Sequence, residues 1–126
     1  MTDKKSVIIV GAGAAGCMAA VTAAKKGCNV TLIDRNPKIG RKLLITGKGR
    51  CNVTNNCEHD TLMSSVVTNN RFLYSAFSAF SPQDTMNFFE TNGVPLKTER
   101  GGRVIVEIPA NGFLDSLFEL QRWFPT

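Results

Sequence analysis

Three glycines and a distant aspartate form the first pattern in this sequence that predicts chemistry. Gly11, Gly13 and Gly16 follow the apolar run 6–10, and Asp34 ends a second apolar run. The first glycine permits a sharp turn, the second lets a diphosphate approach the backbone, and the third allows a helix to pack closely on a strand. The start of that helix offers unpaired N–H groups and a partial positive charge to phosphate. The pattern therefore predicts a dinucleotide site.

Asp34 predicts which sugar this site binds. A carboxylate after the second strand accepts hydrogen bonds from both ribose hydroxyls, whereas it repels a 2′-phosphate. An adenosine with free hydroxyl groups therefore fits better than NADP. The alternative is a glycine turn followed by a surface aspartate. The order strand, glycine turn, helix, strand and acid favours the dinucleotide site.

The run GRKLLITGKGRCNVTN, residues 40–55, is the second pattern with chemical potential. Its glycines can bring backbone N–H groups close to a ligand, and its cations can offset phosphate charge. Asn52, Thr54 and Asn55 supply neutral donors and acceptors suited to the edge of a heteroaromatic ring. Spacing alone does not separate this interpretation from a solvated basic loop. The glycines and cations are Gly40, Arg41, Lys42, Gly47, Lys48, Gly49 and Arg50.

Composition narrows the class of protein. The chain has 126 residues, a net charge of +5 and a pI of about 9.3, which favours anionic partners. No apolar run approaches the roughly 18 residues that a membrane span needs, and the start MTDKK is polar. We therefore expect a cytoplasmic protein without a membrane partner. Its four cysteines, Cys17, Cys28, Cys51 and Cys57, are then expected to be thiols.

The elements that position these residues follow from the apolar pattern. The continuous β-branched run 6–10 predicts a strand covered on both faces. The alanine-rich segment 17–26 predicts a helix that ends at Gly27, and 29–34 predicts a second, parallel strand. Residues 35–56 are expected to be loop, with a short helix possible at 42–45.

The remaining sequence predicts helices and one hairpin. Residues 58–68 carry little pattern, whereas Phe72, Phe77 and Phe80 are spaced as on a helix and favour core positions over a stacking platform. Ser81-Pro82-Gln83-Asp84 is typical of a helix start. The other expected elements are a helix end at 92–93, a hairpin of 94–98 and 103–108 across 99–102, and helical spacing over 111–124.

Three stretches resemble a known family. GAGAAG, then LIDRNPKIGRKLLITGKGRCNVTN, then FSPQDTMNFFETNGVPLKTERGGRV are similar to the N-terminal region of the BaiN-like (YhiN-type) NAD(P)/FAD-dependent oxidoreductases. The resemblance implies an α/β fold: a Rossmann-like βαβ FAD-binding unit with an appended helical segment and β-hairpin. Residues 1–56 would form the dinucleotide-binding half-site and 57–126 the helices and hairpin, diverging after about residue 104.

The resemblance also implies a cofactor and the residues that hold it. FAD would transfer hydride or electrons, with NAD(P)H as donor and an undefined substrate. The implied FAD-binding residues are Gly11, Gly13, Ala14, Ala15, Gly16, Asp34, Arg35, Arg41, Lys42, Gly47, Gly49, Arg50, Cys51 and Asn52.

This sequence departs from the family pattern after the expected hairpin. Family members continue G-R-V-F-P-x-S and are much longer, whereas this chain reads Gly102-Arg103-Val104-Ile105-Val106. We therefore expect a fragment or truncated product with an incomplete FAD site, and no catalytic residue is assigned.

Other interpretations of the same residues stay open. Cys51, Cys57 and His59 form C-x5-C-x-H, whose spacing is unlike that of zinc sites, so no metal is expected. Cys51 beside Arg50 is either a redox thiol or a small packing residue. His59 is expected to be exposed. A basic module for nucleic acid is disfavoured, because it leaves the glycine pattern and Asp34 unexplained. A non-catalytic remnant is the third interpretation.

Overall fold

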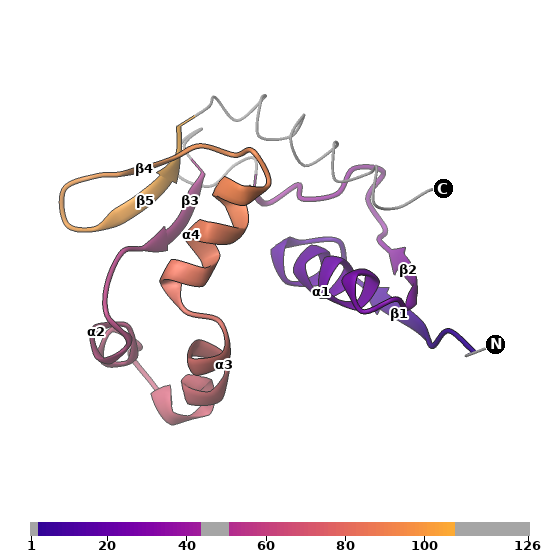
Figure 1. Cartoon of the computed structure of the whole chain (residues 1–126), viewed down its shortest axis with the longest axis horizontal. Coiled ribbons are helices and arrows are strands. Elements are labelled where there is room, and N and C mark those ends of the chain that lie inside the picture. Colours follow the sequence, from indigo (N-terminus) through magenta and orange to yellow (C-terminus); the bar gives the residue numbers. More distant parts are fainter. Residues whose placement is uncertain (1–2, 44–50, 108–126) are drawn as a thin grey trace.

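The first unit of the fold is a strand, a helix and a second strand in close succession. The computed structural model describes residues 3–43 and 51–107. β1 (Ser6–Val10), α1 (Ala14–Lys25) and β2 (Asn29–Ile33) follow one another, and the two strands pair in parallel from Ser6 opposite Asn29 to Val10 opposite Ile33 (Figure 1). The predicted βαβ unit is confirmed.

Small residues let α1 lie close to this strand pair. Ala20 and Val21 are buried, and no charged residue precedes Lys25 in the helix. Lys26 caps the C-terminus, and Gly27 then adopts a φ of +80°, a conformation that glycine reaches without a Cβ clash. The predicted helix end at Gly27 is confirmed.

The strand pair has one bare face among the described residues. Burial alternates along both strands, so that Ile8 is 68% and Val10 83% exposed, with Ile33 at 48% on the neighbouring strand. The prediction that 6–10 is covered on both faces is wrong for the described chain, because α1 covers only one face. The apolar run predicts the strand correctly, but it does not predict how many faces of the strand are covered.

A three-stranded antiparallel sheet forms the second unit. β4 (Leu96–Thr98) and β5 (Arg103–Val106) make the predicted hairpin, and β3 (Asn52–Asn55) pairs with the other edge of β5. Val104 on the central strand is fully buried. The prediction of loop throughout 35–56 is therefore wrong for β3, whose polar residues form a strand because β5 pairs with them.

Three α-helices and one 3₁₀ turn connect β3 to the hairpin. They are α2 (His59–Ser64), η2 (Asn70–Leu73), α3 (Tyr74–Ala79) and α4 (Pro82–Thr91). α4 begins as predicted: the Ser81 side chain accepts from the Asp84 amide, and the Asp84 carboxylate accepts from the Ser81 amide. α2 was not predicted, because a six-residue helix carries little periodicity. Phe72 is 80% and Phe80 42% exposed, so neither is a core residue, contrary to expectation.

The core of the second unit lies where α4 meets the sheet. Cys51, Val94 and Val106 are its buried centre. Leu43, Val53, Phe89 and Leu96 pack against them.

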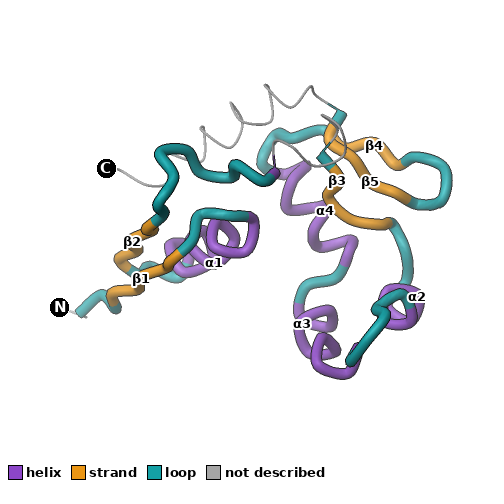
Figure 2. The backbone as a smooth tube through the Cα atoms, turned by 180° about the vertical axis from the view of Figure 1, so that it is seen from behind, coloured by secondary structure: helices purple, strands orange, loops and turns teal. Residues whose placement is uncertain are grey.

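α4 lies between the three-stranded sheet and α1, as views from both sides show (Figures 1 and 2). Within 3–43 and 51–107, no helix is long and apolar enough to cross a membrane. The expected helical pieces at 44–45 and 111–124, and residue 108 of the hairpin, lie outside the described residues.

Candidate functional site

The glycine turn joins β1 to α1 with the geometry that a dinucleotide site requires. Gly11 adopts a φ of +101°, and its N–H donates to the carbonyl of Ile33 at 2.7 Å. A Cβ atom on Gly16 would lie 1.7 Å from the carbonyl oxygen of Gly11, so only glycine permits this approach of helix to strand. A Cβ on Gly13 would meet no described atom within 4 Å. Gly13 therefore borders open space, where a ligand can approach the backbone.

The N-terminus of α1 opens onto the same space. The first N–H groups of a helix have no carbonyl partner within it, and the cap residue Gly13 brings no side chain to satisfy them. Ala14 and Ala15 are exposed, and the first turn carries no acidic residue. This end of the twelve-residue helix can therefore receive an anion.

Asp34 follows β2 and is turned toward the glycine turn. Its Oδ2 accepts a hydrogen bond from the Ala12 amide at 2.7 Å, and its Oδ1 accepts one from the Asn36 amide at 2.6 Å. These two bonds, that from Ala12 first, hold the pKa of the carboxyl below its usual 3.8, and the charge of Arg35 acts in the same direction. Asp34 is therefore ionised at neutral pH.

The carboxylate of Asp34 retains capacity for a ligand. An ionised carboxylate has about four acceptor positions on its two oxygens. The Ala12 and Asn36 amides use one position on each oxygen, and the Asn36 side chain also interacts with this carboxyl, so at least one position is left for a hydroxyl donor. The group is only partly buried, so a ribose can reach it.

The start of the basic run lies against the glycine turn. The Gly40 N–H donates to the carbonyl of Ala12 at 2.8 Å, and Gly40 is buried with a φ of +66°. The Arg41 Nη1 donates to the Asn36 Oδ1 at 3.2 Å, which holds the guanidinium near the Asp34 turn. Gly40 was interpreted as an amide donor for a ligand. The structure uses that amide within the protein instead.

The other candidates differ in how exposed they are. Arg35 and Lys42 are exposed on the same segment. Cys51 is 5% exposed and belongs to the core cluster, so the packing interpretation of this residue is the one that its burial favours. Asn52 begins β3 and is exposed. Gly47, Gly49 and Arg50, together with Lys48, lie outside the described residues.

Asn55 and Asn56 hold the hairpin. The Asn55 Nδ2 donates to the Gly101 carbonyl at 3.2 Å, and the Asn56 N–H donates to the Gly102 carbonyl at 2.7 Å. A Cβ on Gly102 would lie 2.6 Å from the Asn55 Oδ1. The prediction that Asn55 faces a heteroaromatic ligand is therefore corrected, since its amide binds the hairpin turn.

The prediction that His59 is simply exposed is wrong, because its side chain contacts α3. Its Nε2 lies 3.3 Å from the Ser78 Oγ, and its ring makes an edge contact with Tyr74 at 5.2 Å. The histidine thus joins α2 to α3. The four cysteines are thiols, and within the described ranges no three His, Cys, Asp or Glu side chains gather as metal ligands would.

Asn36 and Ala12 are the site residues that sequence reasoning missed. Asn36 links Asp34 to Arg41, and Ala12 links Asp34 to Gly40. The position of Asn36, two residues after an acid and just before a proline, is typical of a turn and was the available signal. Ala12 acts through its backbone, which carries no signal in residue type.

Comparison with known proteins finds relatives that match most of this chain. The chain is 33% identical over 118 residues to the ribosomal RNA dihydrouridine synthase of Escherichia coli strain K12, which covers 93% of this chain. It is 32% identical to the Haemophilus influenzae protein of the same name, again over 93% of the chain. A 3-dehydro-bile acid delta(4,6)-reductase of Clostridium scindens is 33% identical over 76% of the chain.

The chain matches only part of the length of each of these relatives. The chain spans 29% of the length of the E. coli and H. influenzae proteins and 23% of the C. scindens protein. The family described as HI0933-like protein Rossmann domain matches residues 5–121, nearly the whole chain. This match, the parallel β1–β2 pair and the glycine turn agree, and the chain belongs to the HI0933-like Rossmann domain family.

Proposed function

We propose that this chain is the FAD-binding part of a flavin-dependent oxidoreductase. The observation that carries the proposal is the 2.7 Å hydrogen bond between the Ala12 amide and the Asp34 carboxylate, which sets an ionised acid beside the glycine turn. A diphosphate at the N-terminus of α1 and a ribose at Asp34 are then contacts that one adenosine diphosphate can make together. The names of the matched relatives, two synthases of dihydrouridine and a reductase, support redox chemistry.

Each described candidate receives a role in this proposal. Gly13 gives backbone access, and the amides of Ala14 and Ala15 face the diphosphate. Asp34 accepts the ribose hydroxyls, and it disfavours a 2′-phosphate by charge repulsion. Arg41 and Lys42 add positive charge near the phosphates. Arg35 lies on the same exposed segment, and Gly47, Gly49, Arg50, Cys51 and Asn52 remain candidates for contacts further along the cofactor.

A bound flavin supplies hydride or electron transfer, and NAD(P)H is the proposed donor to the longer protein. In this proposal, the adenosine half of FAD is bound and oriented by Gly13, Ala14, Ala15 and Asp34. No residue of this chain is proposed as a general acid or base.

Competition between nucleotides tests the proposal. FAD binding to the 126-residue chain is followed by quenching of flavin fluorescence, and ADP, 2′,5′-ADP and FMN are added as competitors. We expect ADP to displace FAD, because it carries the diphosphate and the free ribose. We expect 2′,5′-ADP to compete at least about tenfold more weakly, and FMN to compete more weakly than ADP because it lacks the adenosine diphosphate. Competition by 2′,5′-ADP equal to that by ADP, or no FAD binding at all, contradicts the proposal.

A base in RNA is a second candidate, as substrate of the longer protein. Cations outnumber acids across residues 3–43, where Asp3 and Asp34 are the acids. Two relatives bear the name ribosomal RNA dihydrouridine synthase. Dihydrouridine differs from uridine by two hydrogens across one C=C bond, a change within the scope of flavin chemistry.

Salt dependence tests this second candidate. We expect a uridine-containing RNA hairpin to bind with an affinity that falls as salt rises, and the slope to be smaller by about one in a Lys42→Gln variant. Salt-independent binding, or none, contradicts RNA as a partner and leaves the flavin proposal untouched.

A further inference from the structure

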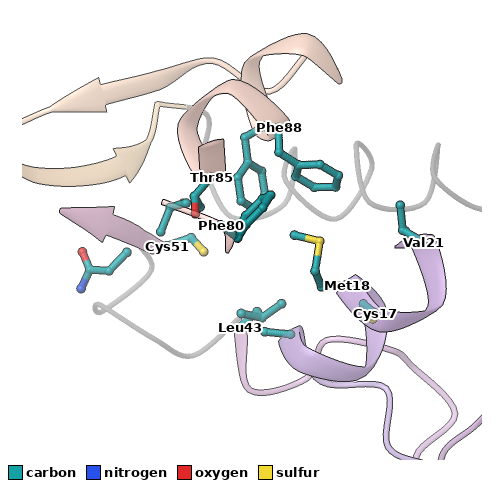
Figure 3. A pocket seen from close by; sticks show the side chains of 12 residues that line it. Cys17, Met18, Val21, Leu43, Cys51, Phe80, Thr85 and Phe88 are labelled. Atoms are coloured by element: carbon teal, nitrogen blue, oxygen red, sulfur yellow. The ribbon is translucent and has the colours of Figure 1, made fainter. Parts of the chain in front are cut away.

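A cavity of about 310 Å³ lies between α1 and α4. One wall is the flank of α1, which contributes Cys17, Met18 and Val21. The opposite wall is Phe80 together with Thr85 and Phe88 of α4, and Figure 3 shows the phenylalanine rings and Met18 directed into the space between the two walls. The cavity thus lies between the two units of the fold.

The cavity is partly open to solvent, and its size is that of a small ligand pocket. Pockets that hold small molecules run from about 300 to 1,000 Å³. A space of about 310 Å³ is at the lower end of that range and suits one compact ring system.

The lining selects an apolar ligand. Apart from two thiols, the polar side chains on its walls are Asn52 and Thr85. A phosphate, a sugar or a charged group would lose its hydration here with few partners in return. Aromatic rings, a thioether and thiols instead form a polarisable surface that adapts to a flat hydrocarbon ring.

Specific contacts hold the two walls in place. The Lys25 Nζ lies 5.3 Å from the centre of the Phe88 ring, which ties the end of α1 to α4. Phe88 packs edge-on against Phe89, and Phe89 packs on the Cys51 core cluster. The cavity is therefore bounded by side chains that the fold already positions.

We propose that this cavity binds the hydrocarbon ring of a small molecule. Ala14, the first residue of α1, lies on its wall, so the ring would be held next to the dinucleotide site. The ring has two possible sources: the dimethylbenzene end of a flavin, or a separate apolar ligand. The proposal does not rest on the proposed cofactor, because the cavity and its lining are properties of the chain itself.

Prodan, a neutral naphthalene dye whose emission shifts to the blue in apolar sites, tests the proposal. We expect the 126-residue chain to bind it saturably, with one site. Val21→Phe fills the cavity from the α1 wall, and we expect it to weaken binding by about tenfold or more. Val10→Phe adds the same ring at an 83% exposed position on the bare face of β1, and it should leave the affinity unchanged.

Thiol protection gives a second measurement that needs no variant. Cys17 lines the cavity, whereas Cys28 does not, and both are partly buried. Saturating prodan should slow alkylation of Cys17 by N-ethylmaleimide several-fold, as measured by peptide mass spectrometry, and leave Cys28 unchanged. Equal rates at Cys17 with and without dye, or equal dye affinity in Val21→Phe and the parent chain, overturn the proposal.

Saturation with FAD identifies the source of the ring. Competitive loss of prodan assigns the cavity to the flavin, whereas undiminished prodan binding beside bound FAD assigns it to a separate apolar ligand. If prodan binds but FAD does not bind even in the absence of prodan, the cavity proposal stands and the cofactor proposal fails.

Discussion

The backbone amide of Ala12 and the carboxylate of Asp34, 22 residues apart in sequence, are joined by a 2.7 Å hydrogen bond. The contact sets the acid at the end of β2 against the turn at the end of β1. It fixes the position of the carboxylate before any ligand arrives.

Replacing Asp34 with asparagine should weaken FAD binding. The amide retains one oxygen for Ala12 but carries no charge and has fewer acceptor positions for ribose hydroxyls. We expect a loss of about tenfold or more in affinity, measured by flavin fluorescence. Asp60→Asn makes the same substitution at a fully exposed side chain on α2, and this variant should bind FAD as the parent chain does. Equal affinity in the two variants contradicts the assigned role of Asp34.

Gly16→Ala should lower the stability of the fold, whereas Gly13→Ala should lower FAD binding and leave stability nearly unchanged. The new Cβ at Gly16 lies 1.7 Å from the Gly11 carbonyl, so we expect a loss of stability of about 3 kcal/mol or more in urea unfolding. At Gly13, a φ of −81° and open space accommodate alanine, and stability should change by less than about 1 kcal/mol. FAD binding should nevertheless fall in Gly13→Ala, because the methyl group lies where the diphosphate approaches. Normal FAD binding by Gly13→Ala contradicts this placement of the diphosphate.

Stability should fall in acid through two carboxylates. Backbone hydrogen bonds from Ala12 and Asn36 lower the pKa of Asp34, and those from the Ser81 amide and then its hydroxyl lower that of Asp84, from the usual 3.8. A lowered pKa in the folded chain adds stability above pH 3.8, and that stability is lost as pH falls through the folded pKa. The gap in unfolding free energy between the parent and Asp34→Asn should therefore shrink as the pH falls from neutral to below 3.8. Parallel curves contradict this linkage.

Replacing Asn55 should cost more stability than replacing Asn52. Asn55→Ala loses the bond to the Gly101 carbonyl, and we expect it to cost about 1 kcal/mol of stability. Asn52→Ala removes an exposed side chain on the cavity wall, so it should change stability by less than about 0.5 kcal/mol. Thermal unfolding by circular dichroism measures both. A larger loss in Asn52→Ala than in Asn55→Ala reverses these assignments.

Local signals in the sequence were enough to predict the βαβ unit, the start of α4 and the hairpin. Each depends on neighbours within a few residues: the glycine turn, the Ser81–Asp84 capping box, and the glycines at 101 and 102. These elements form where the chemistry of adjacent residues determines the backbone conformation.

Long-range partners explain what the sequence could not provide. β3 consists of polar residues that pair with β5 about 50 positions away, and nothing within Asn52–Asn55 indicates that partner. The same distance hid the role of Asn55, whose acceptor belongs to the hairpin turn. The cavity lining could not be predicted from the sequence either, because α1 and α4 contribute to it from separate parts of the chain.

Both backbone polar groups of Ala12, its N–H and its carbonyl, are hydrogen-bonded. Its N–H is held by Asp34 and its carbonyl by Gly40, and the residue is 2% exposed. One short stretch of backbone thereby fixes the positions of Asp34, the N-terminus of α1 and the start of the basic run relative to one another. For the proposed nucleotide, much of the ordering entropy would then be lost during folding rather than on binding, so tight binding would require fewer new contacts.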